Sequence, residues 1–298
     1  MFKNFFYLYI SFSFAQYAPS FDGEKAYEHL LKQCSFGPRY PGSDAHKKLK
    51  NYFVSFLNEY ADSVKVMEHE ISHPYINKKI NLYNILAQFN PTSENRILLM
   101  AHWDTREIAD KDYNIENRNT PIMGANDGGS GIAILMAFAE LFKLNEFINI
   151  GVDLLFVDGE DMGRAGETEN FCLGSRLYAK SQNSKNTKLA ICLDMVADID
   201  AEFKIEYFSY IQAPEIVKEI WSLANSLGYS EFTTSFQSPI YDDHRALFVE
   251  TGIPSIDIID FDYPYWHTLE DTPDKCSAKT LQIVGHVVSE YIYRKDGM

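Results

Sequence analysis

The feature that most constrains this sequence is a set of five side chains that can bind a metal: His102, Asp127, Asp161, Asp194 and His267. The local pattern around each of them predicts a position at the rim of an open sheet. Open α/β sheets place ligands outside the carboxyl ends of their strands. A single Asp there usually caps a helix or forms a turn, but the repeated strand-then-acid layout favours a shared site. Imidazole and carboxylate together suit zinc or another divalent transition metal.

Apolar periodicity predicts strands that alternate with helices along most of the chain. The predicted strands are 64–69, 79–89, 97–101, 152–157, 189–195 and 254–259. Residues 26–60 look helical apart from the breaker-rich loop 36–43, whose Ser43 can cap the following helix. Further helices are predicted near 132–142, 173–180, 215–227, 243–251 and 280–293. This alternation indicates an α/β sandwich.

Length and composition limit the class of protein. The 298 residues are 46% hydrophobic and 23% charged, as in an ordinary globular protein, and evenly spread apolar runs favour one domain. The net charge of −15, without a Lys/Arg cluster, argues against a nucleic-acid partner, because phosphates require a basic face. This charge is compatible with substrates that carry a free amino group.

The first 15 residues are typical of a secretory signal peptide. Lys3 gives a minimal positive start, residues 5–12 form an apolar core, and Ser13-Phe14-Ala15 offers a cleavage site. We therefore expect an exported protein, periplasmic or secreted, with Gln16 as the mature N-terminus. The alternative is an N-terminal core strand or an uncleaved anchor, although the apolar stretch is short for a stable membrane span.

The cysteines leave two alternatives. Disulfides are compatible with export, but the four residues have no C-x-x-C spacing, so they do not indicate a zinc site: Cys34, Cys172, Cys192 and Cys276. Cys192 falls within a predicted buried strand. We favour buried free thiols.

Six motifs, in order along the chain, resemble those of the zinc aminopeptidase-type α/β hydrolases and, within that superfamily, those of the glutaminyl cyclases. They occupy 101–106, 123–127, 156–161, 193–196, 241–244 and 266–268. The resemblance runs from about residue 97 to 272. It implies a three-layer α/β/α sandwich with a mixed central β-sheet, and a single catalytic domain over 16–298.

The resemblance also implies the roles of individual residues. In cyclases the positions of Asp127, Asp161 and His267 hold one zinc ion, which leaves the open coordination position of a catalytic site. The superfamily's peptidases hold two, with His102 and Asp194 as further ligands. Glu160 matches the general acid/base, and Asp194 and Asp242 match a carboxylate network beside it. Trp266 matches a pocket aromatic, and Trp103 is a second candidate for packing against substrate.

Two positions depart from the pattern of the animal cyclases, and the segment 256–263, which contains the second, resembles bacterial members of that group. Asp161 stands where those enzymes have Glu, so the shorter side chain either brings the metal about one methylene closer to the backbone or binds it differently. Asp257 stands where they have a pocket His, so a donor becomes an acceptor. Asp257 is either a pocket residue or a buried acid paired within the sheet. His244 is expected to be a structural hydrogen-bonding residue rather than a ligand.

The resulting hypothesis is a zinc-dependent glutaminyl-peptide cyclotransferase that acts on peptides or proteins with an N-terminal Gln. The substrate's α-amine would attack its own γ-amide carbon, so no protein nucleophile is required. The alternatives are an aminopeptidase with two metal ions, which would use a bridging water, and a binding protein on the same scaffold. The sequence leaves the oligomeric state open.

Overall fold

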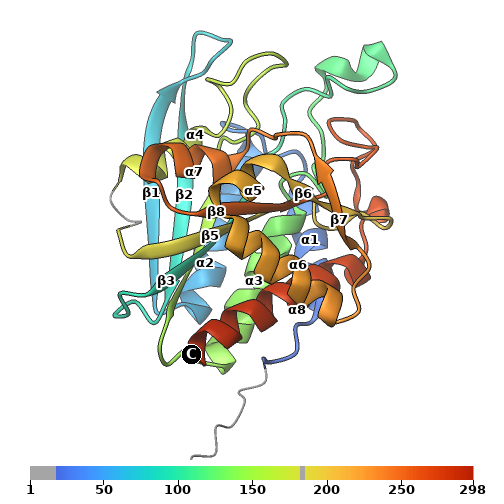
Figure 1. The fold of residues 1–298 in the computed structure, drawn as a ribbon. Helices are drawn as coiled ribbons and strands as arrows, with labels where there is room; N and C mark the ends of the chain where they lie inside the picture. Colours follow the sequence, from blue (N-terminus) through green and yellow to red (C-terminus); the bar gives the residue numbers. More distant parts are fainter. Residues whose placement is uncertain (1–17, 182–184, 298) are drawn as a thin grey trace, which may run out of the picture.

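A six-stranded sheet forms the centre of the structure, a computed structural model that describes residues 18–181 and 185–297. The predicted signal segment and Gln16 lie outside the described residues. The strand order is β1-β2-β4-β3-β5-β8 (Figure 1). The strands are β1 (Ser63–Ser72), β2 (Lys79–Phe89), β3 (Arg96–His102), β4 (Gly151–Val157), β5 (Thr187–Asp194) and β8 (Ser255–Ile259). The last four run parallel, whereas β2 is antiparallel to β1 and β4, so the sheet is mixed as expected.

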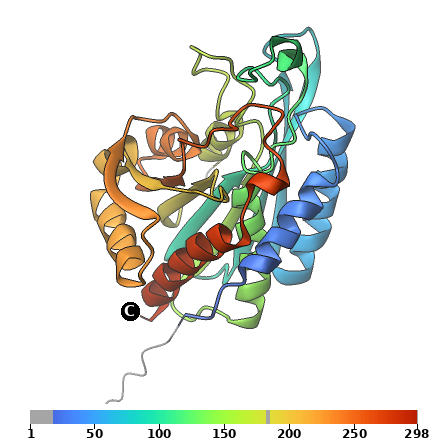
Figure 2. The same ribbon diagram turned by 90° about the vertical axis from the view of Figure 1, so that its right-hand side faces the viewer.

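Helices cover both faces of this sheet. One face is covered by α1 (Gly23–Cys34), α2 (Asp44–Tyr60), α3 (Ser130–Leu144) and α8 (Ala278–Asp296). The other is covered by α4 (Leu173–Lys180) and α7 (Asp243–Thr251), while α5 (Tyr207–Gln212) packs on β8 and α6 (Pro214–Ser226) packs on α5 and α8. Figure 2 shows the blue and the orange helices on opposite sides of the strands. Because both faces are covered, every residue of β3 and β4 is buried.

The predicted elements are confirmed, several with the same bounds. Helices at 173–180 and 243–251 are found as predicted, Ser43 caps α2 by accepting from the His46 amide, and Gly252 ends α7 with a φ of 72°. The sequence did not predict the small parallel sheet of β6 (Phe203–Glu206) and β7 (Phe232–Gln237), nor α5 and the 3-10 helices η1 (Ile115–Asn119) and η2 (Pro273–Lys275).

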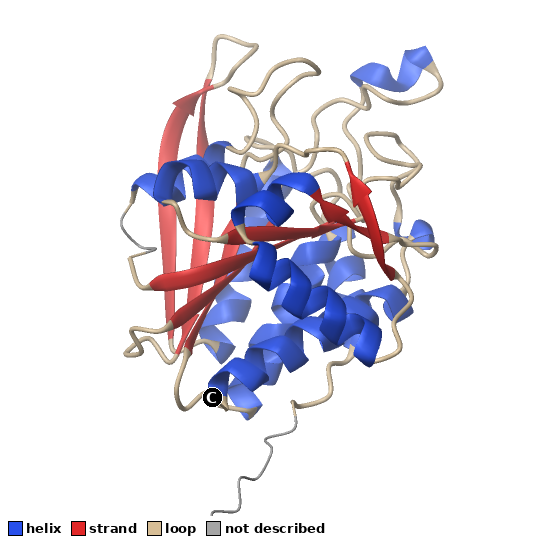
Figure 3. Ribbon diagram, viewed as in Figure 1, coloured by secondary structure: helices blue, strands red, loops and turns tan. Residues whose placement is uncertain are grey.

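The longest connecting loops project from one end of the molecule, at the top of Figure 3. Several of them follow the carboxyl ends of the parallel strands, where the sequence predicted the site. All four cysteines are buried free thiols, as favoured above. Among the described residues, no helix is long and apolar enough to cross a membrane.

Candidate metal centre and catalytic pocket

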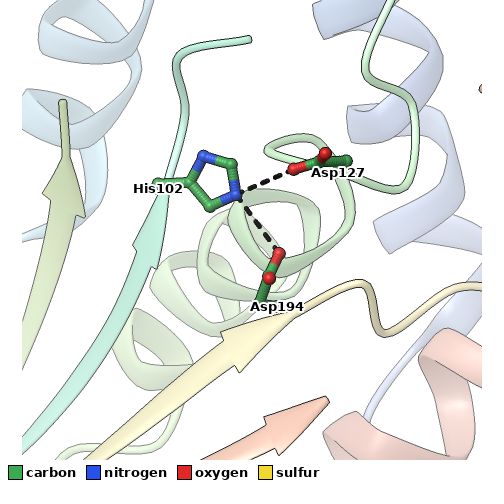
Figure 4. Close-up of side chains that lie close together, drawn as sticks. All are labelled: His102, Asp127 and Asp194. Atoms are coloured by element: carbon green, nitrogen blue, oxygen red, sulfur yellow. Dashed lines mark hydrogen bonds and ion pairs between the residues drawn. The ribbon is translucent and has the colours of Figure 1, made fainter. Parts of the chain in front are cut away.

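The five metal-capable residues converge at the carboxyl edge of the sheet. They form two overlapping groups, His102/Asp127/Asp194 and Asp127/Asp161/His267, within each of which the ligand atoms lie within 4.8 Å of one another. In the first group, Nε2 of His102 lies 3.2 Å from Oδ1 of Asp127 and 3.2 Å from Oδ1 of Asp194 (Figure 4). These three residues come from the end of β3, the loop before α3 and the end of β5.

The second group, one imidazole and two carboxylates, has a donor set that suits zinc. Nε2 of His267 lies 3.5 Å from Oδ2 of Asp127 and 3.4 Å from Oδ1 of Asp161. Oδ2 of Asp127 and Oδ2 of Asp161 are buried and have no hydrogen-bond partner in the protein. Buried carboxylate oxygens without a partner are unfavourable unless a cation satisfies them. These residues therefore fit a divalent cation, with Asp127 offering one oxygen to each group.

Two further buried carboxylates hold the turns that carry this site. Asp104 accepts hydrogen bonds from the backbone amides of Glu160 and Asp161, at 3.1 and 3.2 Å. Asp271 accepts from the amides of Asn126 and Asp127, at 2.8 and 3.2 Å. Neither role was predicted from the sequence, although Asp104 lies inside the motif that begins at Ala101. Asp271 carries no local signal, because its contacts are about 145 residues away in sequence.

Arg39 also holds the loop before Asp127 in place. Its side chain is fully buried and donates to the carbonyl oxygens of Trp103, Met123 and Gly124, at 2.9, 2.8 and 2.6 Å. The sequence placed Arg39 in a breaker-rich loop and gave no sign of burial. Burial lowers the pKa of the guanidinium from its usual value. The three carbonyls offset the lost hydration of the charge, so the loop and Arg39 are ordered together.

Glu160 lies beside this centre. Its Oε1 accepts a hydrogen bond from Sγ of Cys172 at 3.3 Å, and its carboxylate, the Cys172 thiol and Asp242 lie within 4.8 Å of one another. Burial raises the pKa of Glu160 well above its usual range, and the negative charge of Asp242 adds to the shift. A carboxyl group with a raised pKa can both accept and return a proton near neutral pH.

Asp242 lies beside Glu160, and Asp194 lines the same cavity. Burial raises the pKa of Asp194 to about 7, whereas the hydrogen bond from His102 opposes the shift. Asp242 caps α7 by accepting from the amide of Asp243 at 2.5 Å. The position of Asp242 at a helix start explains why its side chain is fixed beside Glu160.

One cavity of about 230 Å³ connects these groups with an aromatic wall. Its lining includes the carboxylates of Glu160, Asp194 and Asp242, the three residues of the second metal group, and the apolar side chains of Phe171, Ile240, Ile259, Phe261 and Trp266. The Trp266 ring packs on His267 and on Phe261, with centroids 3.9 and 5.0 Å apart. Trp266 therefore faces the cavity, where the sequence analysis expected a pocket aromatic.

Two other pocket candidates lie elsewhere. Trp103 is fully buried; its ring stacks on His46 with centroids 4.4 Å apart, and its Nε1 donates to the carbonyl of Tyr83 at 3.2 Å. The expectation that Trp103 packs against substrate is therefore wrong, because the ring belongs to the core between the sheet and α2. Asp257 is also fully buried and does not line the cavity.

Asp257 corresponds to the second alternative for that position, a buried acid within the sheet. Its Oδ2 lies 3.6 Å from Nδ1 of His244, whose Nε2 lies 3.1 Å from Oε2 of Glu206. Burial raises the pKa of Asp257 well above its usual range, and the charge of Asp242 adds to the shift. His244 is thus a structural residue between two acids, as expected, and Asp257 is corrected from a substrate contact to a residue beneath the pocket.

The backbone at the site is unusual. Four non-glycine residues of the described chain have left-handed φ angles, and three of them adjoin the site: Cys172 (56°), Met195 (46°) and His267 (57°). Such conformations are unfavourable for residues with a Cβ and persist where the surrounding structure enforces them. At His267 the left-handed backbone allows two consecutive aromatic side chains, Trp266 and His267, to face one cavity.

Comparison with known proteins places this geometry in a family. A sequence profile of peptidase family M28 matches residues 84–292. A Bacteroides thetaiotaomicron glutaminyl cyclase bound to N-acetylhistamine is 35% identical, with a TM-score of 0.89 over 93% of this chain and 99% of that chain. A Porphyromonas gingivalis glutaminyl cyclase is 32% identical, with a TM-score of 0.90 over 93% and 100%. A Zn-dependent exopeptidase from Parabacteroides distasonis is 35% identical, with a TM-score of 0.89 over 93% and 99%.

The fold and the site define a zinc aminopeptidase-like α/β enzyme. The chain belongs to peptidase family M28 and, within it, to the glutaminyl cyclases.

Proposed function

We propose that this protein is a zinc-dependent glutaminyl-peptide cyclotransferase that converts the N-terminal Gln of peptides or proteins to pyroglutamate and releases ammonia. The observation that carries the proposal is the position of Glu160, in one cavity with Asp127, Asp161 and His267. The similarity to two bacterial glutaminyl cyclases over 93% of the chain supports the choice of substrate.

The residues around the cavity fit the steps of this reaction. The substrate's α-amino nitrogen bonds to the carbonyl carbon of its own γ-amide, Cδ of the Gln side chain. The bond from Cδ to the amide nitrogen breaks, and ammonia leaves. Glu160 takes the proton from the attacking amine and returns it to the departing nitrogen. Trp266 and Phe261 hold the bent side chain near attack geometry and exclude water. Asp127, Asp161 and His267 would hold the zinc ion. As a Lewis acid, the ion would polarise the carbonyl of the substrate's γ-amide.

A zinc aminopeptidase is the second candidate, and one observation favours it. The group His102/Asp127/Asp194 also has three ligand atoms within 4.8 Å, as a second metal site would require. In the cyclase proposal, His102 and Asp194 instead form a hydrogen-bonded pair that supports Asp127 and the carboxylate cluster.

One experiment separates the two functions. The metallated protein is incubated with a Gln-initiated peptide, and the product is identified by mass spectrometry. Loss of one ammonia supports the cyclase, whereas loss of a whole residue supports the peptidase. Zinc content per chain, measured on the same sample by elemental analysis, should be one for the cyclase and two for the peptidase.

We also propose that residues 1–15 direct export and that 16–298 form the mature catalytic domain. Cleavage after Ala15 would expose Gln16, itself a substrate for this reaction. In a host without other cyclases, freshly exported wild type should gain an N-terminal pyroglutamate faster than Glu160→Gln. Equal rates in the two proteins, or a mature terminus at another residue, would contradict self-processing.

A further inference from the structure

Arg106 and Asp110, which have no assigned role above, connect two candidate zinc ligands. Arg106 is 2% exposed and donates from Nη1 to Oδ1 of Asp161 at 2.6 Å. The same guanidinium holds Asp110 with two hydrogen bonds, from Nε to Oδ1 at 2.7 Å and from Nη2 to Oδ2 at 3.1 Å. Such paired bonds fix both the distance and the orientation of the two side chains.

Asp110 reaches the other ligand. Its Oδ1 lies 3.2 Å from Nδ1 of His267, and this buried nitrogen has no hydrogen-bond partner elsewhere in the protein. A carboxylate beside Nδ1 holds the ring proton on that nitrogen, which leaves the Nε2 lone pair for a metal. Nε2 of His267 is the atom that faces Asp127 and Asp161.

The atoms that remain after these contacts are the ones a cation needs. Because Arg106 engages Oδ1 of Asp161, the unpartnered oxygen of that side chain is Oδ2. The unpartnered oxygen of Asp127 is also Oδ2, which lies 3.5 Å from Nε2 of His267. Arg106 thus leaves Oδ2 of Asp161 available to a metal, and Asp110 leaves Nε2 of His267 available.

We propose that Arg106 and Asp110 act as one positioning pair for the zinc site, in which Arg106 reserves Oδ2 of Asp161 for the metal and Asp110 fixes the tautomer of His267. The inference rests on the proposed function only through the identity of the metal site. Arg106 also compensates for the short side chain of Asp161, since a guanidinium bonded to one oxygen restricts the rotation of the carboxylate.

The test measures zinc affinity of the full chain by competition with a chromophoric chelator. Arg106→Met and Asp110→Asn should each weaken zinc binding about 10- to 100-fold, the range found for outer-shell partners of metal ligands. The fold-loss of zinc affinity in the double variant should be smaller than the product of the two single-variant fold-losses, because the residues act through each other. Nitrogen NMR of the zinc form should show the His267 proton on Nδ1 in wild type and a mixture of tautomers in Asp110→Asn.

Arg118→Met and Glu116→Gln are the matched controls. Both residues are exposed on the same loop, and the substitutions make similar charge changes without touching the site. If Arg106→Met does not fold, Arg106→Lys keeps the charge but loses the paired bonds, and it should still weaken zinc binding.

Zinc affinity within about twofold of wild type in folded Arg106 and Asp110 variants would overturn the inference, as would fully multiplicative losses. Wild type that binds zinc but does not cyclise Gln-peptides would contradict the proposed function alone, since the affinity comparison is independent of turnover. Wild type that binds no zinc would overturn both.

Discussion

At the scale of single residues, Glu160 is held at three points. Its amide donates to Asp104 at 3.1 Å, its carbonyl accepts from the Cys172 amide at 2.9 Å, and its Oε1 accepts from the Cys172 thiol at 3.3 Å. These contacts fix the backbone of Glu160 and one of its two carboxylate oxygens. The carboxylate is therefore positioned by neighbours that do not themselves exchange protons with the substrate.

Glu160→Gln should abolish proton transfer while the pocket keeps its shape. We expect turnover to fall roughly 10²–10⁴-fold, the usual contribution of general acid–base catalysis, with zinc content unchanged. Steady-state kinetics and elemental analysis check this result. Glu169→Gln, an exposed acid on the same loop, is the control and should behave as wild type. Near-normal turnover in Glu160→Gln would remove this residue from the mechanism.

Trp266→Ala should weaken substrate binding. An aromatic contact is worth about 0.5–1.5 kcal/mol, so kcat/KM should fall about twofold to 13-fold, mainly through KM, with zinc retained. Trp103→Phe is the contrasting variant: we expect a lower melting temperature but unchanged KM, because Trp103 is in the core. Unchanged kinetic constants in folded Trp266→Ala would show that the indole does not contact substrate.

These two tryptophans show what a sequence can and cannot predict about a site. Each is next to a candidate metal ligand in the sequence, and both were expected at the pocket. Trp103 follows His102 at the end of β3, where successive side chains point to opposite faces, so the ring enters the core. Trp266 precedes His267, whose φ of 57° breaks this alternation. The side-chain direction depends on backbone angles that the motif does not encode.

At the scale of elements, Glu206 joins the start of α5 to the segment 240–244, which lies more than 30 residues later in the sequence. It caps α5 by accepting from the amides of Phe208 and Ser209 at 2.8 and 2.6 Å, and it accepts from the Ile240 amide at 2.9 Å. His244 of α7 lies 3.1 Å away. Burial alone would raise the pKa of Glu206, but the bonds from His244 and these amides lower it to about 2.

The lowered pKa predicts the pH dependence of stability. A carboxylate whose pKa is about 2 in the folded state and 4.5 unfolded stabilises the fold above pH 4.5 and loses that contribution as the pH falls toward 2. Denaturant unfolding should therefore show Glu206→Gln to be less stable than wild type at pH 7, with the difference shrinking by about 3 kcal/mol towards pH 2. Exposed Glu202→Gln should show no such trend. A pH-independent difference for Glu206→Gln would contradict the assignment.

The region around Glu206 is also where the sequence was least informative about elements. The long strands and amphipathic helices were predicted because their apolar periodicity is local. In contrast, β6 has four residues, and the polar strand β7 pairs with it in a separate two-stranded sheet. Such short strands depend on a partner about 30 residues away, so no local pattern marks them.

At the scale of the whole molecule, the fold gathers many acids at one end of the sheet. Burial raises the pKa values of Asp194 and Asp271 to about 7, and the carboxylates of Asp127 and Asp161 each have an oxygen without a partner. Concentrating buried negative charge destabilises a folded chain unless a cation offsets it. The motifs predicted which residues meet here, whereas the supporting contacts of Asp104, Asp271 and Arg39 required the fold.

Removal of zinc should therefore lower the melting temperature of the entire domain. A ligand at a thousand times its dissociation constant stabilises the folded state by about 4 kcal/mol, which corresponds to roughly 8–16 °C for a chain of this size. We expect a chelator to lower the melting temperature of wild type by this amount, and added zinc to restore it. The Asp161→Asn variant should melt at the same temperature with and without zinc, because one metal ligand is weakened. The control Asp262→Asn, at an exposed position, should respond to zinc like wild type. A wild-type melting temperature that is the same with chelator and with zinc would show that the acids at this end of the sheet are not stabilised by a metal.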